Sequence, residues 1–309
     1  MGGDMRKRID GHVHISPHHR DGWRDPLTGM VNHAHGILED AQGHIRRKLP
    51  AYFADSSFPV ESLIAVMDEN GIEKAVVMAH LESEIGETAY DALCKFPDRL
   101  QTAVSVEANE SGLEALKRWN DKGIHILKCE MRSLNEFYGK MDVDAPQMMA
   151  LYKEAEKRNM ILVVDPSPST FPSYQPEGLA HVLDLCPNLK LVICHMGFPY
   201  KGMRNDATIY GKWKKMTDLA KRDNVWFDVT AIPDLFAEEN FPWTSAMEFL
   251  NEFVSKYGAD KVIWGTDIPG TFKNATYTQM IKAFEDCAFL TEENKDKLFY
   301  QNANELYFA

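Results

Sequence analysis

The sequence predicts an α/β fold, a (β/α)8 TIM barrel with a long insertion after its first strand. Short runs rich in β-branched and other apolar residues recur eight times, at residues 8–15, 72–80, 100–107, 124–130, 160–165, 190–197, 225–232 and 261–267. Most of these runs are apolar throughout their centres, which is typical of parallel strands that are covered on both faces. Segments with helical periodicity separate them, and this repeated alternation is what a closed (β/α)8 barrel requires.

The segments between the strands carry apolar stripes and end signals of helices. Residues 60–67 place apolar side chains at positions i, i+3, i+4 and i+7, and Gly71 is positioned to end that helix. Gly123 and Gly258 follow two later stripes in the same way, and Pro146 is suited to the first turn of another helix. The expected helices therefore fall where the barrel needs them.

Composition fits one globular domain and argues against several classes of partner. The 309 residues are 44% hydrophobic and 26% charged, which is ordinary for a globular chain, and we expect a single domain over residues 1–309. No apolar run reaches about 18 residues, so no membrane span is expected. The net charge of −12 argues against binding to nucleic acid, which needs a basic face.

The cysteines and the first residues indicate a cytoplasmic protein. The five cysteines form no Cys-x-x-Cys pair and are expected to be reduced thiols. Residues 1–8 lack the apolar segment of a secretory signal. The long segment 16–59, which contains five histidines, is expected to lie over the barrel mouth as a lid or a subunit contact. A homo-oligomer, most simply a dimer, is therefore expected.

Ionisable side chains or histidines stand at the end of every expected strand, where barrel enzymes carry their catalytic groups. A purely structural barrel has no need of them, because a buried unpaired charge costs several kcal/mol. The strongest combination is His12, His14, His195 and Asp267, whose joint occurrence at strand ends indicates a metal or catalytic site. The full set is His12, His14, His80, Glu107, Lys128, Glu130, Asp165, His195, Asp228 and Asp267.

Strand alternation predicts which of these side chains share a face. His12 and His14 point the same way, as does Asp10, and two adjacent imidazoles form half of a divalent-metal site. If His195 faces the barrel interior, the neighbouring Cys194 is expected to face the helices, which argues against a thiol nucleophile.

Several strand-end residues also have purely structural interpretations. His80 is either a hydrogen-bonded core residue or part of the site. Glu107 and Asp228 are expected to cap a helix or to pair with a lysine. Lys128 and Glu130 share a face and are suited to a buried ion pair.

Three motifs together resemble the amidohydrolase superfamily. They are His-x-His at residues 12–14, Cys-His-Met-Gly at residues 194–197, and Gly-Thr-Asp-Ile-Pro at residues 265–269. The resemblance is closest to the branch that contains aminocarboxymuconate-semialdehyde decarboxylase and related TIM-barrel metal-dependent hydrolases. Residues 301–308 also resemble the last helix of that branch, so the resemblance runs from the first strand to the C-terminus.

The resemblance implies one divalent metal ion, commonly zinc. His12 and His14 match the first two ligands of the family, and Asp267 matches the aspartate after the eighth strand, which also shuttles a proton. His195 matches the catalytic acid–base residue. Where the family usually has a histidine ligand after the fifth strand, this chain has Asp165, whose oxygen ligands favour Mn²⁺ or Mg²⁺ over zinc.

The expected activity is therefore metal-dependent hydrolysis of a small, carboxylated or cyclic compound by a metal-activated water. Lys128 and Arg132 are candidates to hold a substrate carboxylate, and Glu130 and His80 are further candidates for substrate binding. Non-oxidative decarboxylation of an aromatic or muconate-type acid uses nearly the same residues in this family and is the alternative. A metal-free binding protein on the same barrel is a third hypothesis, motivated by Asp165.

Overall fold

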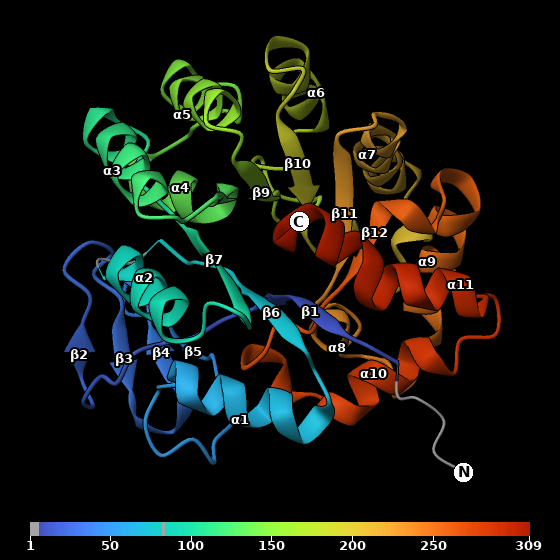
Figure 1. Cartoon of the computed structure of the whole chain (residues 1–309), viewed down its shortest axis with the longest axis horizontal. Helices are drawn as coiled ribbons and strands as arrows, with labels where there is room; N and C mark the ends of the chain where they lie inside the picture. The colour runs from blue at the N-terminus through green and yellow to red at the C-terminus, as the bar shows by residue number, and fades with distance from the viewer. Residues whose placement is uncertain (1–5, 82–83) are drawn as a thin grey trace.

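The computed structural model describes residues 6–81 and 84–309 and contains the expected eight-stranded parallel sheet (Figure 1). Each strand pairs in parallel with the next along the chain, in the order β1-β6-β7-β8-β9-β10-β11-β12. The strands are β1 (Ile9–Val13), β6 (Lys74–Val77), β7 (Leu100–Val104), β8 (Ile126–Glu130), β9 (Ile161–Asp165), β10 (Lys190–Ile193), β11 (Val225–Val229) and β12 (Val262–Trp264). The (β/α)8 prediction is confirmed. Four strands, β6, β7, β10 and β12, end before the polar residues expected at their ends.

Backbone contacts just beyond β12 join the last strand to the first. The amide of Asp267 donates to the carbonyl of His12 at 2.8 Å, and the amide of His14 donates to the carbonyl of Ile268 at 2.7 Å. Gly11 allows this close approach, because a Cβ atom there would lie 2.4 Å from Cγ2 of Ile263. Closure of the barrel thus brings residues 12–14 and residue 267 side by side.

Helices surround the sheet at the expected places. Gly71 ends the first helix at φ 66°, Gly258 follows another at φ 91°, and Pro146 opens a third, as predicted. No helix in the described part of the chain is both long and apolar enough to cross a membrane. The helices are α1 (Val60–Asn70), α2 (Ile85–Lys95), α3 (Glu110–Asp121), α4 (Met131–Tyr138), α5 (Pro146–Lys157), α6 (Pro176–Leu185), α7 (Ala207–Thr217), α8 (Ile232–Leu235), α9 (Thr244–Tyr257), α10 (Tyr277–Glu285) and α11 (Glu292–Asp296).

The helical C-terminus covers the end of the barrel at which the strands begin. Lys74, the first residue of β6, donates to Asn304 at 3.2 Å, and the preceding Glu73 accepts from the Tyr300 hydroxyl at 3.2 Å. Leu306 and Tyr307 pack into the apolar cluster formed by alternate strand residues. The interior is therefore filled and covered at this end, and the polar strand ends lie at the other.

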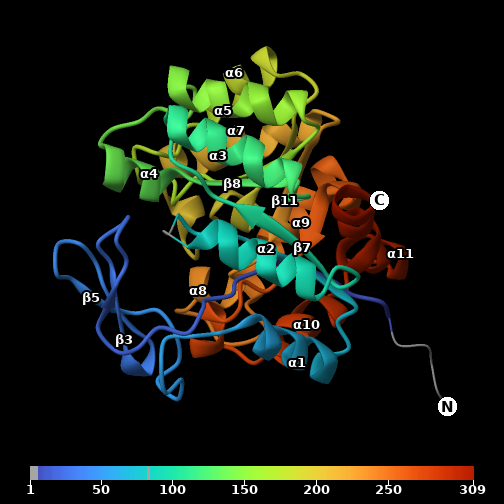
Figure 2. The ribbon, with the colours of Figure 1, turned by 60° about the vertical axis from the view of Figure 1, so that its left-hand side comes forward.

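The insertion after β1 forms a small sheet of its own. It contains β2 (Trp23–Arg24), β3 (Val31–His33), β4 (Ile37–Glu39) and β5 (Ile45–Arg47), which pair antiparallel in that order. Ser16 pairs with Phe58 where the chain leaves and rejoins the barrel. Figure 2 shows this sheet at one side of the barrel.

Candidate active site

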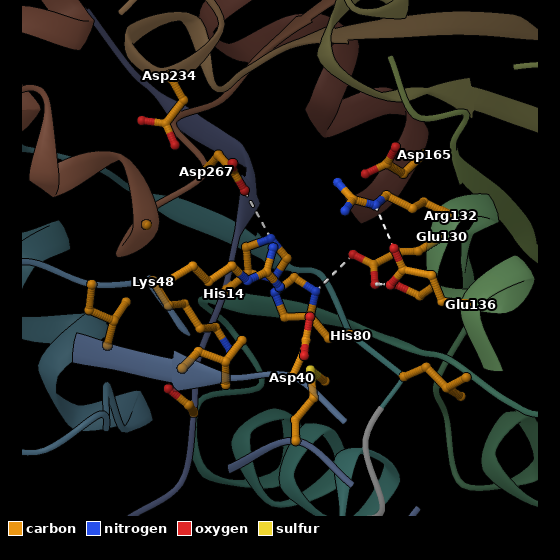
Figure 3. A pocket seen from close by; sticks show the side chains of 18 of the residues that line it. His14, Asp40, Lys48, His80, Glu130, Arg132, Glu136, Asp165, Asp234 and Asp267 are labelled. Atoms are coloured by element: carbon orange, nitrogen blue, oxygen red, sulfur yellow. Dashed lines mark hydrogen bonds and ion pairs between the residues drawn. The ribbon is translucent and has the colours of Figure 1, made fainter. Parts of the chain in front are cut away.

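Three ligand-type side chains converge where β1 meets the segment after β12. Nε2 of His12 and Nε2 of His14 lie 3.3 Å apart, and Oδ1 of Asp267 lies 2.9 Å from the His14 atom and 3.6 Å from the His12 atom. His12 is fully buried, whereas His14 and Asp267 keep a small exposed fraction. Figure 3 shows His14 and Asp267 together at the cavity.

The outer contacts of the two histidines assign their tautomers. Nδ1 of His14 donates to the carbonyl of Met78 at 3.0 Å, and Nδ1 of His12 donates to Oδ2 of Asp228 at 2.9 Å. Burial lowers the pKa of His12 and, with the nearby His80, lowers the pKa of His14 to about 3, so both rings are neutral. Each Nε2 therefore carries a lone pair, and three acceptor atoms face one another. A divalent cation fits this donor set, because it removes the repulsion between them.

Asp267 is held by its backbone in an uncommon conformation. Its φ of 63° lies in the left-handed region, where non-glycine residues occur mostly when the surroundings impose it. Burial alone would raise the pKa of Asp267, but the charge of His195 lowers it well below its usual range. Asp267 is therefore an ionised acceptor.

Asp10 does not share the face of the two histidines, contrary to the alternation argument. The β1–β6 register is irregular between Asp10 and Val13, and a bulge of this kind reverses the side-chain alternation. Asp10 instead accepts from the amide of Thr266 at 2.9 Å and from the hydroxyls of Thr266 and Tyr277, both at 2.6 Å. Asp10 thereby stabilises the segment that leads to Asp267.

Cys194 and His195 both point into the barrel, so the expectation that Cys194 faces the helices is wrong. Cys194 belongs with Val192 to the interior apolar cluster, as alternation along β10 requires. β10 ends at Ile193, and His195 adopts φ 56°, which turns the chain and directs the next side chain inward as well. Burial raises the pKa of the Cys194 thiol well above its usual value, so it is not a reactive thiolate.

His195 lies beside His12, His14 and Asp267. Its hydrogen-bond partners indicate which of its nitrogens carry protons. Its Nδ1 donates to Oγ1 of Thr230 at 2.6 Å, and its Nε2 lies 3.6 Å from Oδ2 of Asp165. Burial alone would lower the pKa of His195, but contact with Asp165 and the charge of Asp267 raise it to about 9. At neutral pH His195 is therefore a proton donor, and its available proton is on Nε2.

Asp165 stands apart from the converging ligand atoms. Among the described residues, the group with ligand atoms within 4.8 Å of one another that faces the cavity contains His12, His14 and Asp267 without Asp165. Its Oδ1 accepts from the amide of Ser167 at 2.8 Å, and its Oδ2 faces His195. In this arrangement the carboxylate acts on His195, and its role as a metal ligand stays a prediction.

Sequence reasoning missed Asp228, which it assigned to a helix cap or a lysine pair. Asp228 is fully buried on β11 and accepts from His12, from the amide of His195 at 2.6 Å and from the hydroxyl of Thr230 at 2.7 Å. Burial alone would raise its pKa, but the hydrogen bond from His12 and the charge of His195 lower it. The signal available in the sequence was the position of Asp228 near the end of an apolar strand.

His80 and Glu130 form a pair at the edge of the site (Figure 3). Nδ1 of His80 donates to Oε1 of Glu130 at 2.7 Å, and the His80 ring stacks on that of His14 with 4.1 Å between centroids. Ser133 donates to the other Glu130 oxygen at 3.2 Å. Burial alone would raise the pKa of Glu130, but its contact with His80 lowers it. Among the described residues, Nε2 of His80 has no hydrogen-bond partner and lies at the cavity.

Lys128 lies beneath the site and not in the cavity, since its side chain is 1% exposed. Burial alone would lower its pKa, but the charges of Glu130, Asp165 and Asp228 raise it, so the ammonium is charged. Its charge disfavours a cation at the second group of ligand-type atoms, formed by His12, Cys194 and Asp228.

A cavity of about 580 Å³ opens above His14 and Asp267. We call His12, His14, His195, Asp228 and Asp267 the site floor. The insertion supplies one side of the cavity through Arg46, Arg47 and Lys48, which we call the insertion wall. Arg132 lines the opposite side, where its Nε pairs with Glu136 at 2.7 Å and its guanidinium lies over Phe171.

The sequence model of the amidohydrolase family matches residues 9–309. The chain belongs to the amidohydrolase family. The resemblance noted from the three motifs is thereby confirmed, over nearly the whole chain.

Solved structures of similar fold include hydrolases and a decarboxylase. A probable 2-pyrone-4,6-dicarboxylic acid hydrolase from Acinetobacter baumannii, with citric acid bound, has a TM-score of 0.70 and 22% identity over 97% of this chain and 99% of that chain. A zinc-bound amidohydrolase from Burkholderia multivorans has a TM-score of 0.69 and 14% identity over 97% and 99%. The 5-carboxyvanillate decarboxylase LigW from Sphingomonas paucimobilis has a TM-score of 0.58 and 13% identity over 84% and 85%. At these identities the likeness shows the fold.

Proposed function

We propose that this amidohydrolase is a metal-dependent hydrolase of a small carboxylated or cyclic compound. One observation carries the proposal: two neutral imidazole Nε2 atoms and an ionised carboxylate oxygen face one another, while both Nδ1 protons are directed to other partners. His12, His14 and Asp267 would hold the ion. When bound, a divalent cation supplies Lewis acidity toward a carbonyl oxygen and toward water.

The residues of the site floor provide the proton transfers that hydrolysis needs. Asp267 is ionised and faces the cavity, so it accepts the proton of the attacking water. His195 is protonated and has Nδ1 committed to Thr230, so Nε2 delivers a proton to the leaving oxygen. Asp165 stabilises the charged form of His195.

Zinc is the ion we expect, because two imidazoles and a carboxylate with an open position are typical of catalytic zinc. The zinc-bound Burkholderia multivorans structure has the same fold. If Asp165 turned toward the ion, the oxygen-rich shell would favour Mn²⁺ or Mg²⁺.

The substrate class follows from the cavity and from the similar structures. Arg132 and the insertion wall place cationic groups at a cavity that also has acidic lining residues, and these cationic groups suit a substrate with carboxylate groups. The Acinetobacter baumannii protein is described as a hydrolase of a cyclic dicarboxylate. A cyclic ester such as 2-pyrone-4,6-dicarboxylic acid is therefore the first compound to test.

Decarboxylation of an aromatic or muconate-type acid is the second candidate, and the state of His195 favours it. A protonated imidazole beside the cavity can deliver a proton to carbon as carbon dioxide leaves. The products distinguish the two reactions, since hydrolysis of a lactone yields an opened acid and decarboxylation yields carbon dioxide.

Elemental analysis of untagged protein purified without added metal is the first test. We expect about one equivalent of a divalent metal; less than about a tenth, with no gain on adding Zn²⁺ or Mn²⁺, would support the metal-free binding protein instead. The loaded protein is then incubated with a panel of cyclic esters and aromatic acids, and products are identified by NMR. Carbon dioxide release without ring opening would show that the protein is a decarboxylase and not a hydrolase.

A further inference from the structure

Asp228 contacts both functional histidines through its two oxygens. Its Oδ2 accepts from Nδ1 of His12 at 2.9 Å. Its Oδ1 accepts from the backbone amide of His195 at 2.6 Å and from the Thr230 hydroxyl at 2.7 Å. Because that hydroxyl donates to Asp228, it accepts from Nδ1 of His195 at 2.6 Å. One buried carboxylate thus links the two histidines.

We propose that Asp228 is a positioning residue that fixes the metal-facing nitrogen of His12 and the placement of His195 at once. The proposal rests on the function proposed above for its metal site. An ionised carboxylate offers acceptors on both oxygens and no donor, which is what three donors shared between its two oxygens require. A carboxylate behind a ligating histidine sets the ring's tautomer and orientation in the same way at metal sites generally.

The first consequence concerns His12. With its Nδ1 proton directed at Asp228, its Nε2 keeps a lone pair toward His14 and Asp267. If a donor replaced the Asp228 oxygen, the imidazole proton would move to Nε2. A protonated Nε2 cannot bind a cation.

Asp228→Asn tests this with almost no change in shape. The amide has one oxygen and one NH2 group, so it cannot accept on both sides. Placing its oxygen toward the His195 amide and Thr230 keeps two hydrogen bonds, and the NH2 group then faces His12. This orientation is favoured, because the opposite one would place the NH2 group, a donor, against the backbone N–H of His195, which is also a donor. The variant should therefore fold while its His12 loses the metal-binding tautomer.

Thr230→Val is the matched control. It is nearly isosteric and removes the acceptor of Nδ1 of His195, while the contact between Asp228 and His12 stays intact. Metal affinity should depend on the contact between Asp228 and His12 and not on the contact between Thr230 and His195.

Zn²⁺ affinity is measured by competition with a chromophoric chelator on folded wild type and both variants, with circular dichroism and thermal unfolding as fold controls. We expect Asp228→Asn to weaken Zn²⁺ binding by about 10- to 100-fold and Thr230→Val to leave it within about twofold. Wild-type affinity in folded Asp228→Asn would overturn the proposal.

Long-range ¹H–¹⁵N spectra of the metal-free proteins test the same inference without metal or activity. The His12 proton should lie on Nδ1 in the wild type and in Thr230→Val, and on Nε2 in Asp228→Asn. A wild-type His12 protonated on Nε2 would overturn the proposal, even if the variant failed to fold. If the wild type binds no Zn²⁺ but the tautomer changes as expected, the proposed function fails and the positioning role of Asp228 stands.

Discussion

The site floor and the insertion wall differ in how firmly their side chains are held. His12 and Asp228 are fully buried, and each floor residue is bonded to another part of the barrel. On the wall, Arg46 and Arg47 are exposed on a small sheet beside the barrel. The floor is therefore pre-organised for a reaction, whereas the two wall arginines are exposed to what enters. Changes to the floor should act on metal binding and kcat, and changes to the wall on KM.

The largest effect is expected from His12→Ala, which removes a ligand from the floor. Bound metal should fall below about a tenth of an equivalent, and turnover should fall at least about 1000-fold because the Lewis acid is lost. His181→Ala, which removes an exposed histidine of α6 that is bonded to Asp144, is the control. A full equivalent of metal in folded His12→Ala would remove His12 from the ligand set.

His195→Ala separates chemistry from metal binding within the floor. Its side chain touches the ligands but is not needed to hold the ion, so the metal content should remain near the wild-type value. The kcat should fall by about 10²- to 10⁴-fold, the usual contribution of a positioned acid–base group. Elemental analysis and steady-state kinetics measure the two effects, and retained turnover would exclude His195 from the mechanism.

Gly11→Ala tests how tightly the floor is closed. A Cβ atom would lie 2.4 Å from Cγ2 of Ile263 and 3.0 Å from the carbonyl of Trp264, so overpacking should lower the free energy of unfolding by about 1–3 kcal/mol. Gly211 on α7 has open space around its Cβ position, so Gly211→Ala should raise it by about 0.5–1 kcal/mol. Urea denaturation of both variants gives the comparison, which fails if the two changes have the same sign.

The sequence could predict those parts of the molecule that depend on local signals. Apolar runs and glycine stops are local signals, so the eight strands and the ends at Gly71 and Gly258 followed from spacing. His12, His14 and Asp267 followed from strand ends and motifs, and the structure brings them together. Their metal and catalytic roles await the measurements above.

The misses arose where the backbone departs from regular geometry. A bulge in β1 reverses the side of Asp10, and a left-handed residue after β10 turns His195 inward beside Cys194. The spacing of residue types in the sequence does not reveal the bulge or the left-handed residue. Asp228 was missed for a different reason, because its histidine partners come from β1 and from the turn after β10, and only the closed barrel brings them to it.

Arg46→Ala tests the insertion wall. Among the described residues Arg46 has no hydrogen bond or ion pair within the protein, so its guanidinium is available to a substrate anion. Because it is exposed, we expect KM to rise by only about two- to fivefold with kcat unchanged. Arg20→Ala, at an exposed arginine of the insertion outside the cavity, is the control. A fall in kcat at constant KM would place Arg46 in the chemistry and remove the distinction between floor and wall.

The smallest effect is expected far from both regions, at Asp218 on the outer helices. Burial alone would raise the pKa of Asp218, but hydrogen bonds from Lys256 and Tyr257 lower it to about 2. A carboxyl with a lowered folded-state pKa stabilises the protein above its unfolded pKa, near 4, and loses that contribution as pH falls toward 2. The Asp218 side chain is 41% exposed, so Asp218→Asn should cost less than about 1 kcal/mol at pH 6. Urea denaturation should show this cost shrinking between about pH 5 and pH 3. A cost that stayed constant with pH would assign the effect to packing and not to charge.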